Sequence, residues 1–129
     1  MRTVGIIAEY NPFHNGHAYQ IRKAKELTNA DYCVVVMSGD FVQRGAPALM
    51  DKYLRTECAL RNGADLILEL PVCFALSSAE TFARGAITLL DRLGIVDAVC
   101  FGSECGDINV LRDFAKELLC ETPVFKETL

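Results

Sequence analysis

Two histidines, His14 and His17, are the only histidines in the chain, and Gly16 lies between them. They follow an apolar run and open a charged, periodic segment, which places them on the first turn of a predicted helix. Residues three apart on a helix face the same side, so we expect both imidazoles on one face. A helix start presents unpaired backbone N–H groups and a partial positive charge, and imidazoles add donors. This spacing predicts a site for a triphosphate.

The turn before this helix suits close contact with a ligand. Gly16 has no side chain, so a phosphate or a planar ligand can approach the backbone there. Pro12 restricts the turn that leads into the helix. Gln20 lies one turn beyond His17 and is expected to face the same ligand. The alternative interpretation is that the two histidines are surface residues near a helix start and bind nothing.

A second polar group, Ser38, Gly39 and Asp40, follows the next apolar run. We predict that Asp40 orients a substrate or a metal-bound water, with a turn or helix cap as its alternative role. Arg44 lies in a loop beside Gly45, which favours a functional role. We therefore expect Ser38, Gly39 and Arg44 to bind substrate.

Further basic residues follow at Lys52, Arg55 and Arg61, and with Arg44 they offer a strip for RNA or phosphate. For Arg55 and Arg61 we favour a simpler interpretation, the solvated face of a helix.

Hydrophobic periodicity predicts four strands that alternate with four helices. Continuous apolar runs are typical of strands buried on both faces of a parallel sheet, and a period near 3.6 indicates helices. The predicted strands cover residues 3–9, 31–37, 65–70 and 98–101, and the predicted helices cover residues 15–29, 51–62, 78–93 and 107–120. Residues 72–76 are expected to be a linker. The inward positions of the first two helices are expected to be Ala18, Ile21, Ala24, Leu27, Leu54, Cys58 and Ala59.

This order predicts an α/β fold, a Rossmann-like parallel sheet with helices on both faces and right-handed crossovers. In such sheets, ligands bind outside the carboxyl ends of the strands, where the strand order reverses. Three polar segments that contain glycine, 11–17, 38–40 and 102–104, are expected to meet there. Within the third, Ser103 and Glu104 are candidates to contact adenine or ribose, and a helix cap is the alternative role of Ser103.

Length and composition are those of one soluble domain. The chain has 129 residues, of which 51% are hydrophobic and 23% charged, and its net charge of −4 does not suggest non-specific nucleic-acid binding overall. The six cysteines form no C-x-x-C pair, so we expect reduced, structural thiols in a cytoplasmic protein without a signal peptide, and no zinc site. No apolar run approaches the ~20 residues that a membrane span needs.

Longer motifs indicate a family. A His-x-Gly-His turn after the first strand resembles the nucleotidylyltransferase superfamily. The segments 5–17 and 37–45, together with Asn62-Gly63-Ala64-Asp65, Glu69-Leu70-Pro71 and Cys100-Phe101-Gly102-Ser103-Glu104, resemble the N-terminal catalytic domain of the bacterial tRNA(Met) cytidine acetate ligase family. The resemblance covers nearly the whole chain.

Members of that family use ATP to activate acetate as acetyl-adenylate and pass the acetyl group to the N4 amine of the wobble cytidine in elongator tRNA(Met). The resemblance implies ATP with Mg²⁺ as cofactor, and acetate and tRNA as partners. It implies that His14 and His17 contact the phosphates, and we assign catalysis to these two residues and Asp40. The residues expected to bind ATP are Ile7, Ala8, Glu9, Tyr10, Asn11, Pro12, Phe13, His14, Asn15, Gly16, His17, Gln20 and Gly102.

The resemblance has one important departure. Family members are much longer, with a later Ser/Thr-rich, Arg-containing phosphate loop and a helical tRNA-binding region that this sequence lacks. Residues 1–129 are therefore expected to form a single, truncated nucleotide-binding domain. Two alternatives stay open, a nucleotidylyltransferase that acts on a small phosphorylated acceptor and an ATP-binding fragment without turnover. A dinucleotide dehydrogenase is disfavoured because the first turn has no G-x-G-x-x-G.

Overall fold

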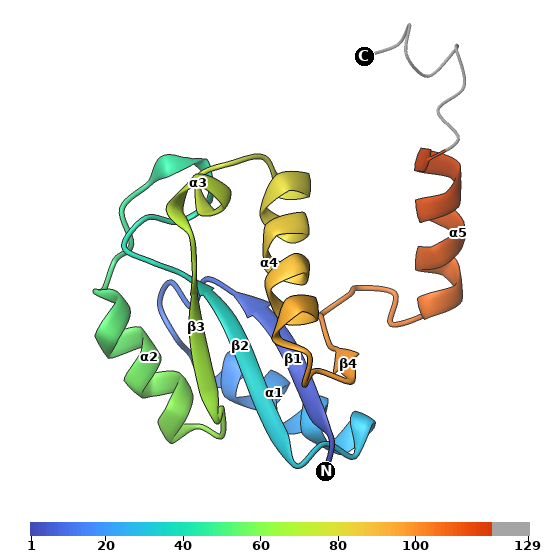
Figure 1. Cartoon of the computed structure of the whole chain (residues 1–129), viewed down its shortest axis with the longest axis horizontal. Coiled ribbons are helices and arrows are strands. Elements are labelled where there is room, and N and C mark those ends of the chain that lie inside the picture. Colours follow the sequence, from blue (N-terminus) through green and yellow to red (C-terminus); the bar gives the residue numbers. More distant parts are fainter. Residues whose placement is uncertain (120–129) are drawn as a thin grey trace, which may run out of the picture.

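The first strand, β1 (Thr3–Ala8), lies inside a four-stranded parallel sheet of order β3-β2-β1-β4. The computed structural model describes residues 1–119, apart from the side chain of Arg44, and is shown in Figure 1. The other strands are β2 (Tyr32–Ser38), β3 (Leu66–Leu70) and β4 (Ala98–Val99). The helices are α1 (Asn15–Thr28), α2 (Lys52–Arg61), α3 (Val72–Ala75), α4 (Ala79–Leu93) and α5 (Ile108–Leu119), with a 3₁₀ turn at Gln43–Gly45.

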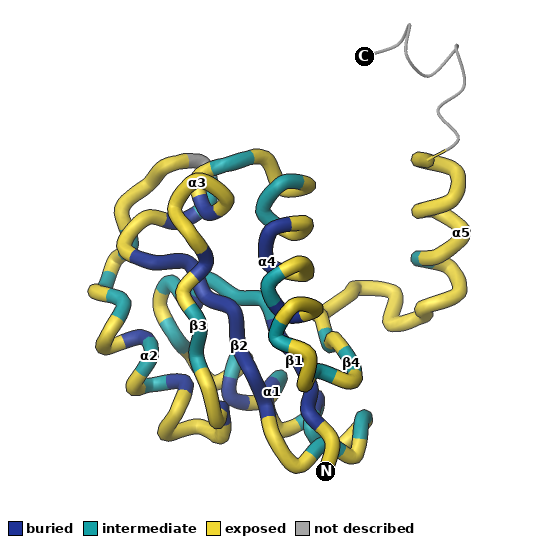
Figure 2. Tube along the Cα trace, in the orientation of Figure 1, coloured by how far each residue is buried: buried dark blue, intermediate teal, exposed yellow. Residues whose placement is uncertain are grey.

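Two apolar layers hold the sheet between its helices, as the alternation of side chains along buried strands requires. On one face, Val35 packs with Ile21 of α1 and Ala59 of α2. On the other face, Val36 packs with Ala75 of α3 and Leu90 of α4. Figure 2 shows the buried residues concentrated along β1 and β2. The predicted fold, a Rossmann-like parallel sheet with helices on both faces, is confirmed.

The strand order reverses at β1, because β2 and β3 lie on one side of it and β4 on the other. β1 pairs with β2 along its full length, from Thr3↔Tyr32 to Ala8↔Met37. Its pairing with β4 is confined to Val4↔Ala98 and Gly5↔Val99. A crevice beside the carboxyl end of β1 is therefore the expected ligand position in this topology.

Three local predictions need correction. The fourth strand is shorter than predicted, and α3 occupies the predicted linker. Leu27 is 68% exposed, although Ala18, Ile21 and Ala24 are buried as predicted. A strict spacing of three residues drifts around a helix of 3.6 residues per turn, so Leu27 points about 180° away from Ala18.

Helix α2 turns a different face to the core from the one predicted. Leu54 is 40% exposed and Cys58 is only half-buried, whereas Arg55 and Ala59 are buried. Arg55 and Ala59 are four residues apart, so they share one face of the helix. Leu54, one residue before Arg55, is consequently turned about 100° away from that face.

Helix α5 extends away from the sheet in Figure 1 and has no buried residue. The predicted end of this helix at Cys120 lies outside the described residues, as does the predicted break at Thr122–Pro123. The five cysteines that precede residue 120 carry free thiols, as predicted for them. None of the helices that the structure describes is long and apolar enough to cross a membrane.

Candidate nucleotide-binding site

The turn between β1 and α1 is built around the ring of Tyr10. Tyr10 has a φ of 49°, in the left-handed region, and its side chain is 1% exposed. Its ring packs 4.9 Å from the Phe13 ring, nearly edge-on, and 4.8 Å from the His17 ring. Burial raises the pKa of the Tyr10 phenol, so this group stays neutral. The Tyr10 ring thus supports His17 from the core side and leaves only the backbone of Tyr10 to face a ligand.

The two histidines cap the start of α1 reciprocally. The Nδ1 atom of His14 accepts a hydrogen bond from the Gly16 N–H at 3.1 Å, and Nδ1 of His17 accepts one from the His14 N–H at 3.2 Å. Together they form a capping box in which imidazoles replace the usual hydroxyl and carboxylate. The rings stack with centroids 3.7 Å apart and planes 27° apart. The predicted side-by-side placement of the two imidazoles is confirmed.

This cap determines which ring nitrogen carries the proton. In a neutral imidazole, the nitrogen that accepts a hydrogen bond has no hydrogen, so the proton of each ring is on Nε2. Burial lowers the pKa of His17, and the neighbouring His14 lowers it further, so His17 is neutral at pH 7. Each ring consequently keeps one Nε2–H group that the cap does not use and that can donate to an anion.

A cavity of about 400 Å³ opens beside this helix start. Its wall includes most of the residues predicted to bind ATP, namely Ile7, Ala8, Glu9, Tyr10, Asn11, Pro12, His14, His17 and Gln20. Asn15 is exposed at the helix start, and Phe13 is half-buried against the core. A Cβ at Gly16 would lie 2.9 Å from Cε1 of His14, so the glycine makes room for the His14 ring as well as for a ligand.

Three polar segments were predicted to meet here, and this prediction is wrong: only segment 11–17 lines this cavity, and no residue of 38–40 or 102–104 does. β4 separates from β1 at Gly5, where the Cys100 N–H donates to the Gly5 carbonyl at 2.9 Å. β1 continues for three more residues, about 10 Å at the rise of a strand, so the chain after β4 leaves the sheet before it reaches the carboxyl edge. Ser103 instead borders a separate depression along α1 with Tyr19 and Lys23. A contact between Gly102 and a nucleotide stays a prediction.

The second predicted group, Ser38 to Asp40, lies at the end of β2 and faces a different hollow. Gly39 and Asp40 border a small cavity of about 150 Å³ with Glu69. Ser38 is fully buried and its Oγ has no hydrogen-bond partner, so the side chain is not available to a substrate. A Cβ at Gly39 would come within 2.2 Å of Oε1 of Glu69, so the absence of a side chain there admits the glutamate.

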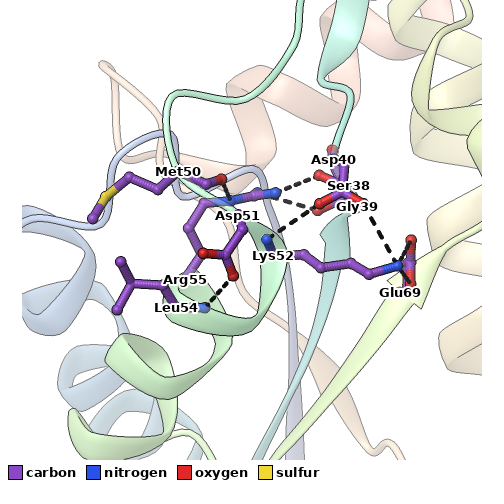
Figure 3. A network of polar contacts seen from close by, with 9 residues as sticks. All are labelled: Ser38, Gly39, Asp40, Met50, Asp51, Lys52, Leu54, Arg55 and Glu69. Atoms are coloured by element: carbon purple, nitrogen blue, oxygen red, sulfur yellow. Dashed lines mark hydrogen bonds and ion pairs between the residues drawn. The ribbon is translucent and has the colours of Figure 1, made fainter.

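Asp40 is held by the start of α2, as its alternative role as a cap predicts. Its Oδ1 accepts from the Lys52 N–H at 3.3 Å, and its Oδ2 lies 3.8 Å from Nζ of Lys52 (Figure 3). The same Nζ is 2.8 Å from Oε2 of Glu69, and Asp51 supplies the N-cap of α2. Asp40 is exposed and does not line the histidine cavity. Its predicted role in catalysis stays a prediction, as does substrate binding by Arg44.

Arg55 is the site-associated residue that the sequence interpretation missed. It was expected on a solvated face, but it is the largest of the fully buried side chains. Its guanidinium group donates to the backbone carbonyls of Glu9, just after β1, and Ser38, at the end of β2. The available signal was its spacing of four residues from Ala59, which is also buried. Arg61 is exposed and paired with Glu57, as predicted for a solvated position.

The sequence model of the HIGH Nucleotidyl Transferase family matches residues 1–129, the full length of the chain. The chain belongs to this family. The His14–His17 cap, in the turn after β1, is therefore a feature of a HIGH nucleotidyl transferase domain.

Curated relatives of the domain include tRNA(Met) cytidine acetate ligases. The protein from Caldicellulosiruptor bescii is 57% identical over 129 residues, and that from Clostridium perfringens is 54% identical over 129 residues. Each alignment covers all of this chain and 32% of the relative, so the chain spans about a third of the length of these relatives. The resemblance inferred from the motifs is confirmed.

Solved structures agree with the fold. Thermotoga maritima TmcAL bound with alpha-thio ATP matches with a TM-score of 0.89 and 51% identity, over 95% of this chain and 30% of that one. The apo form of the Thermotoga protein matches with a TM-score of 0.87 over 92% of this chain and 28% of that one.

Proposed function

We propose that this domain binds ATP in the cavity between the β1–α1 turn and the start of α1. The observation that carries the proposal is the reciprocal histidine cap, which leaves the Nε2–H groups of His14 and His17 as adjacent donors at a helix N-terminus. Ile7 and Ala8 supply apolar wall, and Gln20 adds an amide one turn further along α1. The Thermotoga relative bound with alpha-thio ATP supports the same ligand class.

Within the part of the chain that the structure describes, the side chains do not by themselves form a magnesium cage. Among residues 1–119, no group of three or more His, Cys, Asp or Glu side chains is placed to hold a metal ion. The Glu9 carboxylate accepts from the Gln43 N–H at 2.7 Å, and Asp40 is engaged by Lys52. We therefore assign Mg²⁺ to the phosphates of ATP, which commonly carry this ion with several waters, and derive no step from a protein metal site.

For the whole protein we propose activation of acetate and transfer of the acetyl group to tRNA. A carboxylate oxygen of acetate attacks the α-phosphorus of ATP, the bond from that phosphorus to the bridging oxygen breaks, and pyrophosphate leaves. The N4 amine of the wobble cytidine in elongator tRNA(Met) then attacks the acetyl carbonyl. A C–N bond forms, the bond from the acetyl carbon to the phosphate oxygen breaks so that AMP leaves, and the amine releases one proton to solvent. This reaction needs positioning and electrostatic stabilisation of the phosphates and no nucleophilic side chain, which matches a site built from two imidazole N–H donors and a helix start. The names of the curated relatives support the assignment.

The test compares this chain with a version extended past Leu129 to the length of its relatives, called here the extended chain. Calorimetry should show that both bind ATP more tightly than AMP, because AMP lacks the phosphates that reach the histidines. The extended chain should release pyrophosphate only when acetate is present. Release that depends on a small phosphorylated acceptor would instead identify a nucleotidylyltransferase of that kind.

A narrower function for residues 1–129 alone is ATP binding without turnover. The specific observation in its favour is that the chain covers 32% of the relatives' length. Binding of ATP by this chain, with pyrophosphate release only from the extended chain, would identify that case.

A further inference from the structure

Arg55 is a buried cation whose partners are all backbone carbonyls. Burying an unpaired charge costs several kcal/mol even after the protein relaxes, so a fully buried guanidinium needs dense hydrogen bonding. Nε donates to the Met50 carbonyl at 3.0 Å, and Nη1 donates to the carbonyls of Glu9 at 2.6 Å and Ser38 at 3.1 Å. Nη2 donates to the Gly39 carbonyl. Four of the five N–H groups of the fork are thus used.

These carbonyls belong to three separate segments. Glu9 follows β1, Ser38 ends β2 and Gly39 follows it, and Met50 lies in the loop that leads to α2; Figure 3 shows the last three. At the carboxyl end of a parallel sheet, the last carbonyls extend past the neighbouring strand. They therefore have no backbone N–H of that strand to bind and need another donor. The planar guanidinium of Arg55 satisfies these groups with one rigid side chain, which a lysine ammonium on a flexible stem does not reproduce.

The same three segments are tied together at the nucleotide turn. Oε1 of Glu9 accepts from the Gln43 N–H at 2.7 Å, and Oδ1 of Asn11 accepts from the Leu49 N–H at 2.7 Å. The loop between β2 and α2 is therefore fastened at two points to the turn that precedes His14. The Arg55 guanidinium is hydrogen-bonded both to the turn after β1, at Glu9, and to the loop between β2 and α2, at Gly39 and Met50.

Two of the carbonyls that Arg55 binds, those of Glu9 and Gly39, each precede a residue of interest. Glu9 precedes Tyr10, whose left-handed backbone places its ring 4.8 Å from the ring of His17. Gly39 precedes Asp40, which faces Lys52 at the start of α2. A movement of either carbonyl would rotate the following residue, so the position of Arg55 affects both the β1–α1 turn and the Gly39–Asp40 segment.

We propose that Arg55 is a positioning residue that holds the β1–α1 turn and the Gly39–Asp40 segment in the mutual geometry required for adenylate formation. It is fully buried, so it acts through these backbone groups and not by touching ATP. The inference rests on the proposed function for its catalytic readout. A misplacement of reacting groups by about 1 Å lowers rates about 100-fold, so loss of this bridge affects turnover more than ATP binding.

The experiment uses Arg55→Lys and Arg55→Ala in the extended chain, with Arg61→Lys as matched control on the exposed side of the same helix. Rates are measured per folded molecule, well below the melting temperature of each variant. Arg55→Lys is expected to lower kcat for acetate-dependent acetyl-adenylate formation about 10- to 100-fold and to raise Kd for ATP less than about 5-fold. Arg61→Lys is expected to change neither.

Chemical rescue separates positioning from general stabilisation. Millimolar guanidinium should restore part of the rate of folded Arg55→Ala, because it can occupy the vacated space and bond the same carbonyls, whereas urea at equal concentration should not. An unchanged kcat in folded Arg55→Lys would overturn the proposal. A rate loss that merely follows the loss of folded protein would also overturn it.

Amide NMR shifts, which need no turnover, test the role of Arg55 separately from the proposed formation of acetyl-adenylate. In Arg55→Lys, the amide NMR resonances of Tyr10 and Asp40 should shift, whereas in Arg61→Lys they should stay in place. If the wild-type extended chain forms no acetyl-adenylate, the proposed function fails, and these amide shifts alone decide the role of Arg55. Unchanged resonances in Arg55→Lys would refute that role.

Discussion

Replacing His14 tests whether its two ring nitrogens have separate roles, Nδ1 in capping α1 and Nε2 in binding phosphate. Nδ1 accepts from the Gly16 N–H to cap α1, and Nε2 is left to donate to a phosphate. Asparagine is among the best N-cap residues, so His14→Asn retains an acceptor for the cap and removes the outer donor. Alanine removes both. The pair of variants therefore separates stability of the helix start from ligand binding.

The expected magnitudes follow from the two hydrogen bonds. Loss of an N-cap acceptor costs about 0.5–2 kcal/mol of stability, which His14→Ala should show and His14→Asn should largely avoid. A hydrogen bond to a charged group contributes about 1.5–3 kcal/mol, so both variants should bind ATP about 10- to 150-fold more weakly. Affinity for AMP, which lacks the outer phosphates, should change much less.

The assay is calorimetric titration with ATP and AMP, combined with urea unfolding of each variant. Lys23→Gln serves as the matched control, because it changes a partly exposed residue of α1 whose ion pair with Glu26 lies at the surface, and it should leave both quantities near wild type. ATP binding by His14→Asn at wild-type affinity would refute phosphate contact through Nε2. Equal stabilities of His14→Asn and His14→Ala would refute the capping role.

Three further predictions concern the fold and its pH dependence. Burial and His14 lower the pKa of folded His17 below the usual 6.5, so the unfolded chain binds this proton more readily. The contribution of His17 to stability should be complete above about pH 6.5 and decline as the pH falls through the lowered pKa. Between about pH 7.5 and 5, the free energy of unfolding should therefore fall less steeply in His17→Gln than in the wild type. A Cβ at Gly85 would lie 2.5 Å from the Phe74 ring, so Gly85→Ala should lower stability by about 1–2 kcal/mol in urea unfolding despite the better helix propensity of alanine, and a rise would contradict this packing of α3 on α4. Ile21→Ala should cost about 2–4 kcal/mol and Leu27→Ala less than about 1 kcal/mol, and similar losses would show that Leu27 belongs to the core after all.

Local sequence signals predicted the histidine turn well. The spacing of His14 and His17, after an apolar run and before a periodic segment, determines both the strand-to-helix turn and the shared face of the rings. The reciprocal cap was not predicted, because capping boxes are normally formed by Ser or Thr with Glu or Gln, and the sequence interpretation considered the imidazoles only as donors to a ligand. The sequence thus predicted the position of these residues but not their capping role, and their contact with phosphate stays a prediction.

Features that depend on distant segments were harder to predict. Arg55 is buried because carbonyls of Glu9 and Ser38, 46 and 17 residues away in sequence, converge on its position. The four-residue spacing from Ala59 indicates only that the two residues share a helix face; it does not reveal the convergence of carbonyls, and an arginine on a helix is usually exposed. The early end of β4 at Val99 likewise depends on its pairing with β1, so the residues after it could not be placed from their composition.

The most direct test of the central claim is the nitrogen NMR spectrum of the two imidazoles, recorded with and without ATP at neutral pH. The structure predicts that His14 and His17 both carry their proton on Nε2, and that ATP shifts the Nε2 resonances strongly while the Nδ1 resonances stay close to their free values. Protonation on Nδ1 in either ring, or Nε2 signals that do not respond to ATP, would contradict the account.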